Sequence, residues 1–283
     1  MMPPAEELVA LMTAAARAAG RAIMAVYAEP DIGVEAKADD SPVTRADLAA
    51  HDSITSTLSA ACPQLPLLSE EGDLPPFDVR RQWQRYWLVD PLDGTKEFIR
   101  RSGEFTVNIA LVEGGEAVLG VIYAPATNTL YAGQRMGQDR TTWRAWKINA
   151  DGDQADIHSN PLAANASNMV VKLVASRDHG LDKTPALIGR LAAIWPQVEV
   201  KPMGSSLKMC LLAEGLADLY WRHGPTGEWD TAAAQAIVEA AGGGLFGMDG
   251  APFRYNQRAG LTNPAFYAVG SVEPDWQALL ADL

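Results

Sequence analysis

The stretch of residues 87–98 places two carboxylates where they could share a metal ion. It reads Trp-Leu-Val-Asp-Pro-Leu-Asp-Gly-Thr-Lys-Glu-Phe, so an apolar run leads into Asp90, and Asp93 follows three residues later. These carboxylates, with the carbonyl of Leu92 between them, can converge on Mg²⁺, which favours oxygen ligands and keeps positions for water and phosphate. Gly94 lets a phosphate approach the backbone, and the N–H groups of a following helix would hold it. Taken alone, the pattern is equally compatible with a polar turn.

Two further acidic segments could complete such a site. An apolar run ends in Glu70 and Glu71, which places carboxylates at the end of another strand. Farther along, Glu228 and Asp230 open an alanine-rich helix. Each segment has an ordinary explanation by itself, because surface loops are often acidic and aspartate commonly caps a helix N-terminus. Four carboxylates in one pocket would repel one another and take up protons unless cations neutralised them.

A third group of polar residues lies at a predicted helix start. Gly204 is followed by Ser205 and Ser206, with Lys208 two residues later. A glycine-led helix start with hydroxyls and a lysine can bind a second phosphate or a ribose. A plain helix N-terminus explains the same pattern, and both interpretations stay open at this point.

In the N-terminal part, predicted helices and strands must bring these residues together. Apolar residues at helical spacing predict a helix over Ala5–Tyr27, and a second helix runs from about Thr44 to Ser59. Strand-like runs follow at Leu65–Leu68, Tyr86–Val89, Phe105–Val112, Ala117–Tyr123 and Thr129–Ala132. Gly114 and Gly115 predict a hairpin between the third and fourth of these strands.

The C-terminal part alternates between strands and helices. Strands are predicted at Val170–Ala175, Val198–Lys201 and Ala217–Trp221, and helices at Lys183–Ile194, Ser205–Glu214 and Thr231–Ala241. Such alternation is typical of an α/β unit. Between Gln134 and Asn168 the chain is polar with little periodicity, and we place a domain boundary near Asn160. Residues 1–160 then form an α+β domain with most of the candidate metal ligands, and residues 161–283 an α/β domain that contributes Asp230 and substrate contacts.

Composition excludes several classes of protein. The chain has 283 residues, of which 48% are hydrophobic and 20% charged, which is typical of a globular fold and not of a disordered chain. Its formal net charge of −12 would repel a nucleic-acid polymer, so any bound anion needs a local source of positive charge. Cys62 and Cys210 are too few for a disulfide scaffold and lack the spacing of a metal site, so we expect both to be buried.

The sequence also predicts a cytoplasmic protein. It contains no run of 18 apolar residues, and acids stand near its start where a signal peptide has bases. Peripheral attachment to the inner face of a membrane stays open, as does a homodimer. The expected partner is a small molecule and not a nucleic-acid polymer.

The acidic segments together resemble the lithium-sensitive, magnesium-dependent phosphatase superfamily that includes inositol monophosphatases and fructose-1,6-bisphosphatases. One signature is residues 87–95 with Phe98, and the other is Trp229-Asp230-x-Ala232-Ala233 through Gly242-Gly243, with Glu70-Glu71 upstream. The similarity covers nearly the whole chain. It implies an α+β or α/β fold, a layered αβαβα sandwich.

Within that superfamily the chain is most similar to the 3'(2'),5'-bisphosphate nucleotidases of the CysQ type. The segments that carry this likeness are residues 37–47, 96–99, 103–110 and 204–208, and Glu97 stands where inositol monophosphatases usually have Asn. The resemblance implies hydrolysis of adenosine 3',5'-bisphosphate to AMP and phosphate, with 3'-phosphoadenylyl sulfate as a second candidate substrate. The alternatives are an inositol monophosphatase, a sugar bisphosphatase, or a non-catalytic protein that retains the fold.

The resemblance also implies a role for individual residues. Two or three Mg²⁺ ions would be bound by Glu70, Asp90, the carbonyl of Leu92, Asp93 and Asp230. Thr95, linked to Asp47 and close to Glu70, would orient or deprotonate the attacking water. Substrate contacts would come from Glu70, Leu92, Asp93, Gly94, Thr95, Ser205, Ser206, Lys208 and Asp230. One departure from the superfamily is the stretch Ser176-Arg177-Asp178-His179, in which Asp178 replaces a serine.

Overall fold

The computed structural model describes residues 3–37, 41–136, 142–162, 170–176 and 184–283. The N-terminal part contains a seven-stranded sheet in the order β3-β4-β5-β6-β7-β8-β9, in which β3 and β4 are parallel and the other pairs antiparallel. Its strands are β3 (Leu67–Ser69), β4 (Arg85–Asp93), β5 (Thr106–Glu113), β6 (Glu116–Ala124), β7 (Thr129–Met136), β8 (Thr142–Ile148) and β9 (Gln154–Asp156). The other elements of this part are α1 (Ala5–Tyr27), β1 (Glu35–Ala36), β2 (Pro42–Val43), α2 (Arg45–Ala61), α3 (Phe77–Arg80) and α4 (Thr95–Ile99).

The C-terminal part contains a second sheet of five strands in the order β11-β10-β12-β14-β13. Its strands are β10 (Val170–Ala175), β11 (Gln197–Pro202), β12 (Leu219–Arg222), β13 (Gly244–Gly247) and β14 (Phe266–Val269). The helices of this part are α5 (Thr184–Ala192), α6 (Leu207–Ala213), α7 (Glu228–Ala240) and α8 (Trp276–Leu280).

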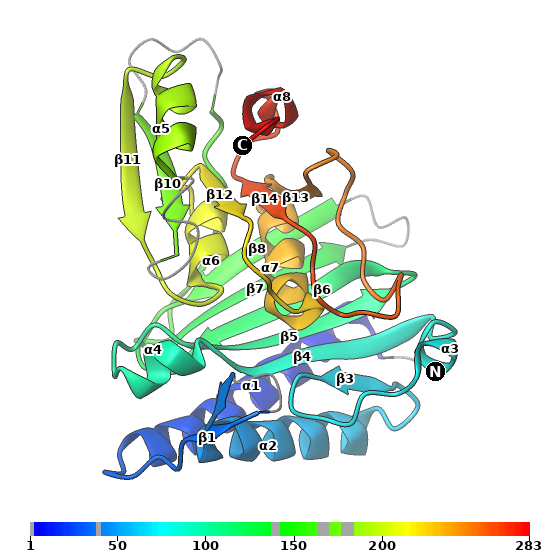
Figure 1. Ribbon diagram of the computed structural model, residues 1–283. Coiled ribbons are helices and arrows are strands. Elements are labelled where there is room, and N and C mark those ends of the chain that lie inside the picture. The colour runs from blue at the N-terminus through cyan, green and yellow to red at the C-terminus, as the bar shows by residue number, and fades with distance from the viewer. Residues whose placement is uncertain (1–2, 38–40, 137–141, 163–169, 177–183) are drawn as a thin grey trace.

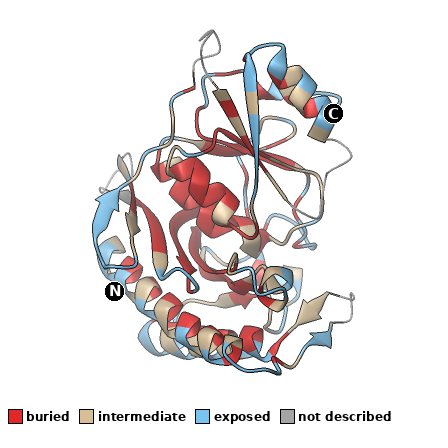
Figure 2. Ribbon diagram, turned by 90° about the vertical axis from the view of Figure 1, so that its left-hand side faces the viewer, coloured by how far each residue is buried: buried red, intermediate tan, exposed pale blue. Residues whose placement is uncertain are grey.

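Helices and sheets alternate in layers, which confirms the predicted αβαβα sandwich (Figure 1). Helices α1 and α2 cover one face of the seven-stranded sheet, and α6 and α7 lie between the two sheets. Helices α5 and α8 cover the outer face of the second sheet. The middle layer is buried almost throughout, whereas α1 and α2 expose one side to solvent (Figure 2).

Helix α7 belongs to the C-terminal part of the chain but packs on the first sheet. Two glycines of that sheet allow this close approach. A Cβ atom on Gly120 would lie 2.2 Å from the carbonyl oxygen of Ala233, and one on Gly133 would lie 2.6 Å from the Cα of Ile237. The small residues of the predicted alanine-rich helix therefore bring its backbone against the sheet, and with it the acidic residues of its first turn.

Helix α1 is long and apolar enough to cross a membrane. We did not predict this, because the sequence contains no run of 18 apolar residues. Its apolar side, which includes Met12, Ala15, Ala19 and Ile23, is buried in the core beneath the first sheet. A buried core helix passes the same test of length and composition, so the finding is weak evidence for a membrane span.

The structure matches most predicted elements and adds others. The first helix has the predicted bounds, and both cysteines are unpaired and buried. The polar stretch after Gln134, however, contains the rest of β7 and the strands β8 and β9, which we did not predict. Strand β8 mixes charged and aromatic residues and β9 is mostly polar, since a strand near a sheet edge need not be uniformly apolar. The chain changes sheets between β9 and β10, and the division at Asn160 into two domains stays a prediction.

Candidate active site

Strands β3 and β4 bring acidic residues to one edge of the seven-stranded sheet. The β4–β5 register shifts between Asp90 and Asp93, where Pro91 cannot donate to the ladder. The Oδ1 atom of Asp90 accepts a hydrogen bond from the backbone N–H of Leu92, at 3.0 Å. Because β3 runs parallel to β4, Glu70 follows the end of β3 at the same edge.

The structure brings three of the predicted metal ligands together. One carboxylate oxygen each of Glu70, Asp90 and Asp230 lies within 4.8 Å of the others. Asp230 comes from the first turn of α7, where its Oδ2 atom also accepts the N–H of Gly227 at 2.9 Å. It therefore caps the helix and faces the cluster at the same time. An oxygen-only donor set of carboxylates fits a hard cation such as Mg²⁺.

Burial and mutual repulsion raise the pKa values of these carboxyls. Burial, followed by the charges of Glu70, Asp93 and Asp230, raises the pKa of Asp90 well above its ordinary value. Burial and the charges of Asp93 and Glu70 likewise raise the pKa of Asp230. Burial raises the pKa of Glu70 too, although Lys37 opposes it. A divalent cation would remove this repulsion, which is the physical reason to expect one here.

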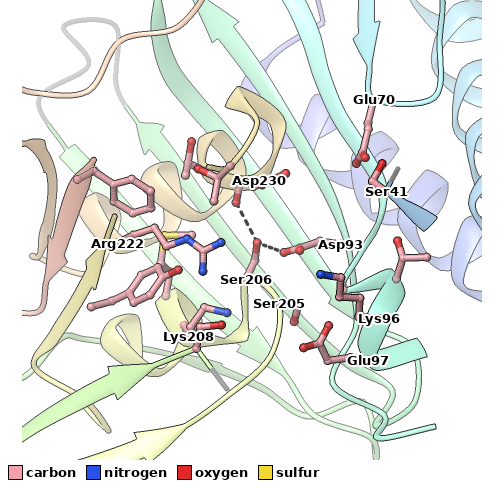
Figure 3. Close-up of a pocket in the computed structure, with 18 of the residues that line it drawn as sticks. Ser41, Glu70, Asp93, Lys96, Glu97, Ser205, Ser206, Lys208, Arg222 and Asp230 are labelled. Atoms are coloured by element: carbon pink, nitrogen blue, oxygen red, sulfur yellow. Dashed lines mark hydrogen bonds between the residues drawn. The ribbon is translucent and has the colours of Figure 1, made fainter. Parts of the chain in front are cut away.

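The remaining carboxylate among the predicted ligands, Asp93, lies beside the cluster and is held by neighbouring side chains. Its Oδ2 atom accepts the hydroxyl of Ser206 at 2.6 Å and the amide of Asn108 at 3.4 Å. The same hydroxyl lies 2.9 Å from the carbonyl oxygen of Asp230 (Figure 3). Ser206 therefore lies between two candidate ligands from distant parts of the chain.

Thr95 and Asp47 lie together, as the resemblance implied. The hydroxyl of Thr95 donates to Asp47 Oδ1 at 3.1 Å and lies 3.4 Å from the carbonyl oxygen of Leu92. The other oxygen of Asp47 accepts the N–H and the hydroxyl of Thr44, both at 2.7 Å, in a capping box at the start of α2. Burial raises the pKa of Asp47 despite these hydrogen bonds. Gly94 has a φ of 93° and lets the chain turn sharply into α4.

A pocket that opens to solvent extends from Glu70 to Lys208 and Arg222, which form its basic end (Figure 3). The predicted substrate residues Ser205, Ser206 and Lys208 line it, together with Arg222 (Figure 3). Lys208 is buried over the ring of Tyr220 and donates to a backbone carbonyl at 3.3 Å. Burial lowers the pKa of Lys208, and Arg222 lowers it further, although Asp93 opposes this. Arg222 and Lys208 thus place basic groups in the pocket of an acidic protein.

Sequence reasoning missed three residues of this site. Arg222 ends β12 and projects into the pocket, while donating to two backbone carbonyls of the following loop. Lys37 pairs with Glu70 at 2.8 Å and with Glu71 at 2.5 Å. Asn108 contacts Asp93 from β5. A base at a strand end was a signal for Arg222, but nothing local marks Asn108, because its role depends on the neighbouring strand.

Part of the predicted departure from the superfamily cannot be placed. Ser176 lines the pocket, whereas Arg177, Asp178 and His179 lie outside the described residues. The effect of Asp178 on phosphate binding therefore stays a prediction.

Comparison with known proteins identifies the family. The model of the inositol monophosphatase family matches residues 5–281. The chain belongs to this family. It is therefore a phosphatase, and the resemblance stated for the sequence is confirmed.

Within the family, the chain is of the CysQ type. A protein of Escherichia coli strain K12 named 3'(2'),5'-bisphosphate nucleotidase CysQ is 45% identical over 252 residues, which are 89% of this chain and 95% of the relative. The crystal structure of CysQ from Bacteroides thetaiotaomicron is 40% identical, with a TM-score of 0.75, and covers 92% of this chain and 95% of that one. An inositol monophosphatase from Zymomonas mobilis is 24% identical, with a TM-score of 0.68, covers 98% of both chains, and supports the fold alone.

Proposed function

We propose that this phosphatase is a Mg²⁺-dependent 3'(2'),5'-bisphosphate nucleotidase. Its substrate would be adenosine 3',5'-bisphosphate, which it hydrolyses at the 3'-phosphate to AMP and phosphate, with 3'-phosphoadenylyl sulfate as a second substrate. The observation that carries the proposal is a pocket that runs from Glu70, past Asp93 and Asp230, to Lys208 and Arg222 (Figure 3). A substrate with two phosphates matches such a pocket, and the printed names of the CysQ relatives support the choice.

The acidic end would hold two or three Mg²⁺ ions through Glu70, Asp90, the carbonyl of Leu92, Asp93 and Asp230. When bound, Mg²⁺ supplies a Lewis acid that activates water and neutralises the charge on the transferred phosphoryl group. When no cation is present, the carboxylates would repel the scissile phosphate, because like charges repel. The backbone N–H groups at Gly94 and Thr95, at the start of α4, would face that phosphate.

Thr95 and Asp47 would orient the attacking water. Because the hydroxyl of Thr95 donates its only proton to Asp47 at 3.1 Å, its oxygen is left to accept a hydrogen bond from water. Asp47 in turn is fixed by both bonds from Thr44. A proton taken from the water could pass through Thr95 to Asp47, whose pKa is raised by burial.

The basic end would bind the second phosphate. Arg222 offers a planar group that can contact two phosphate oxygens, and Lys208 adds a point charge. Ser205 lies next to Gly94, near the expected position of the scissile phosphate, and its φ of 47° turns the chain sharply before α6. Arg222 and Lys208 would distinguish a bisphosphate from a monophosphate.

Phosphate release measured in parallel on three substrates tests the proposal. Adenosine 3',5'-bisphosphate, inositol 1-phosphate and fructose 1,6-bisphosphate would each be given to the enzyme with Mg²⁺ and with excess chelator. We expect the nucleotide to have the highest kcat/KM and chelator to abolish its hydrolysis. A preference for inositol 1-phosphate or the sugar bisphosphate would replace the nucleotidase with the corresponding activity.

Action in the cytoplasm, as a homodimer, belongs to the same proposal, and cell fractionation and light scattering would test it.

A further inference from the structure

Ser206 occupies the N-cap position of α6 but does not cap the helix. An N-cap serine usually has an extended backbone, and its hydroxyl accepts a backbone N–H from the first turn. Ser206 instead has a helical backbone, with φ −67° and ψ −5°, and its side chain makes no capping hydrogen bond. Its hydroxyl is thus directed elsewhere.

The hydroxyl of Ser206 links Asn108 to Asp93. Asn108 donates its amide to the hydroxyl oxygen at 2.9 Å, and the hydroxyl lies 2.6 Å from Asp93 Oδ2. The carbonyl oxygen of Asp230 is a second acceptor at 2.9 Å. A hydroxyl has one proton, and the shorter bond to a charged acceptor is the stronger of the two. The proton therefore goes mainly to Asp93.

The orientation of Asn108 supports this chain of hydrogen bonds. Its amide oxygen is buried and has no hydrogen-bond partner among the described residues, which is a cost. Turning the amide over would aim that oxygen at the carboxylate of Asp93 and at the hydroxyl of Ser206. The unpartnered oxygen is thus the consequence of placing both amide hydrogens on the side of Asp93.

Burial makes these contacts hard to replace. Ser206 is 2% exposed and Asn108 is 1% exposed, so little solvent reaches either residue, although Ser206 borders the pocket. Asp93 lies at the end of β4, and Asp230 lies in the first turn of α7. Ser206 precedes α6 and contacts both, which connects the two sides of the acidic cluster (Figure 3).

We propose that Ser206, supported by Asn108, is a positioning residue for the cation site. Its hydrogen bond to Asp93 Oδ2 leaves Oδ1 of the same carboxylate for the cation. Its contacts with Asp93 and Asp230 also hold the end of β4 in position relative to the start of α7. The inference rests on the proposed Mg²⁺ site and goes beyond its ligands. It differs from the substrate contact implied by the resemblance, because the hydroxyl proton and one lone pair are already engaged within the protein. Partners of this kind typically change metal affinity by about 10–100-fold when they are removed.

The test measures Mg²⁺ binding to chelator-treated protein without substrate. Calorimetry and the Mg²⁺-dependent rise in Tm would compare the unaltered protein with Ser206→Ala. We expect Ser206→Ala to weaken Mg²⁺ binding about tenfold or more, and Ser206→Thr, which keeps the hydroxyl, to restore it. Ser271→Ala is the matched control, because Ser271 is also a buried serine with backbone hydrogen bonds; it should leave Mg²⁺ affinity unchanged.

A double-mutant comparison tests the link through Asn108. Asn108→Ala should weaken Mg²⁺ binding in the same direction as Ser206→Ala. The double variant should lose less than the sum of the two, because both act through one carboxylate. Full additivity would contradict the chain from Asn108 to Asp93.

The outcomes separate the inference from the proposed function. If the unaltered protein binds no Mg²⁺, the proposed cation site itself fails. If it binds Mg²⁺ and Ser206→Ala binds equally well, the inference fails, whether the variant loses stability or not. If Ser206→Ala raises only the KM for adenosine 3',5'-bisphosphate, Ser206 is a substrate contact and not a positioning residue.

Discussion

Individual side chains in this site have chemical roles that their environment assigns. Asp47 and Ser206 stand at positions where such residues commonly cap a helix, and Thr95 is the first residue of α4. The structure turns Thr95 towards Asp47 at 3.1 Å and Ser206 towards Asp93 at 2.6 Å. Lys208 and Arg222 carry positive charge into the same pocket. Two predictions at this scale test what these groups do.

The first prediction concerns Thr95. Thr95→Ala removes the oxygen that would accept a hydrogen bond from the attacking water, so kcat should fall by about 10²–10⁴-fold, the usual contribution of acid–base assistance. Thr95→Ser keeps the hydroxyl and should retain most of the rate. Steady-state phosphate release at saturating Mg²⁺ measures both. Equal rates for Thr95→Ala and the unaltered enzyme would remove Thr95 and Asp47 from the mechanism.

The second prediction concerns Arg222. Arg222→Ala should lower kcat/KM for adenosine 3',5'-bisphosphate by about 10–100-fold, since a charged hydrogen bond contributes about 1.5–3 kcal/mol. Hydrolysis of adenosine 3'-monophosphate, which lacks the second phosphate, should change little. Comparison of the two substrates on the two enzymes measures the difference. A similar loss on both substrates would show that Arg222 does not contact the second phosphate.

At the scale of elements, the close packing of α7 on the first sheet sets where Asp230 lies. This packing requires glycine at positions 120 and 133, because a side chain at either position would collide with Ala233 or Ile237 of α7. The parallel pairing of β3 and β4 places Glu70 at the same edge. The site is therefore built where α7 begins and where β3 and β4 end.

A third prediction follows from this packing. Gly133→Ala would put a Cβ atom 2.6 Å from the Cα of Ile237, so α7 must shift. We expect a loss of about 1–3 kcal/mol in the free energy of unfolding, with a lower Mg²⁺ affinity because Asp230 moves. Gly189→Ala, in α5 with no heavy atom within 4 Å of the added carbon, is the control; it should be neutral or stabilising. Denaturant unfolding of both variants checks the prediction, and equal stabilities would contradict it.

At the scale of the whole molecule, a protein of net charge −12 gathers the carboxylates of Glu70, Asp90 and Asp230 in one place. The pKa values of Glu70, Asp90 and Asp230 are raised, so these groups bind more protons when folded than when unfolded. Their contribution to stability is present below their ordinary pKa values and is lost as the pH rises through the raised ones.

A fourth prediction uses this dependence. In the metal-free protein the contribution of these carboxyls falls with rising pH, and Asp90→Asn should weaken that fall and raise the metal-free Tm at pH 8. Mg²⁺ must displace their protons, so it should raise Tm more at pH 8 than at pH 5. At 100 times its dissociation constant it should contribute about 2.7 kcal/mol. Thermal unfolding with chelator or Mg²⁺ measures both effects. Equal Mg²⁺ stabilisation at the two pH values would contradict the placement of the cation among these carboxylates.

Sequence patterns predicted much of the fold because its signals are local. The amphipathic spacing of α1, the glycine pair between β5 and β6 and the alternation after Val170 each depend on neighbouring residues only. Strand β8 was missed because it mixes charged and aromatic residues, and β9 because it is short and mostly polar. The candidate ligands were found from motifs, whereas Lys37, Asn108 and Arg222 gain their significance from residues far away in the chain.

The sequence by itself determined the family, the class of chemistry and the residues able to bind a cation, because those depend on side-chain types at short, fixed spacings. Only the tertiary structure decided which atoms meet. Glu70, Asp90 and Asp230 converge because parallel strands end at one edge and α7 packs closely against the same sheet. The hydroxyl of Ser206 contacts Asp93 rather than the N-terminus of its own helix for the same reason. Packing between residues far apart in the sequence determines such contacts, so no local sequence pattern predicts them.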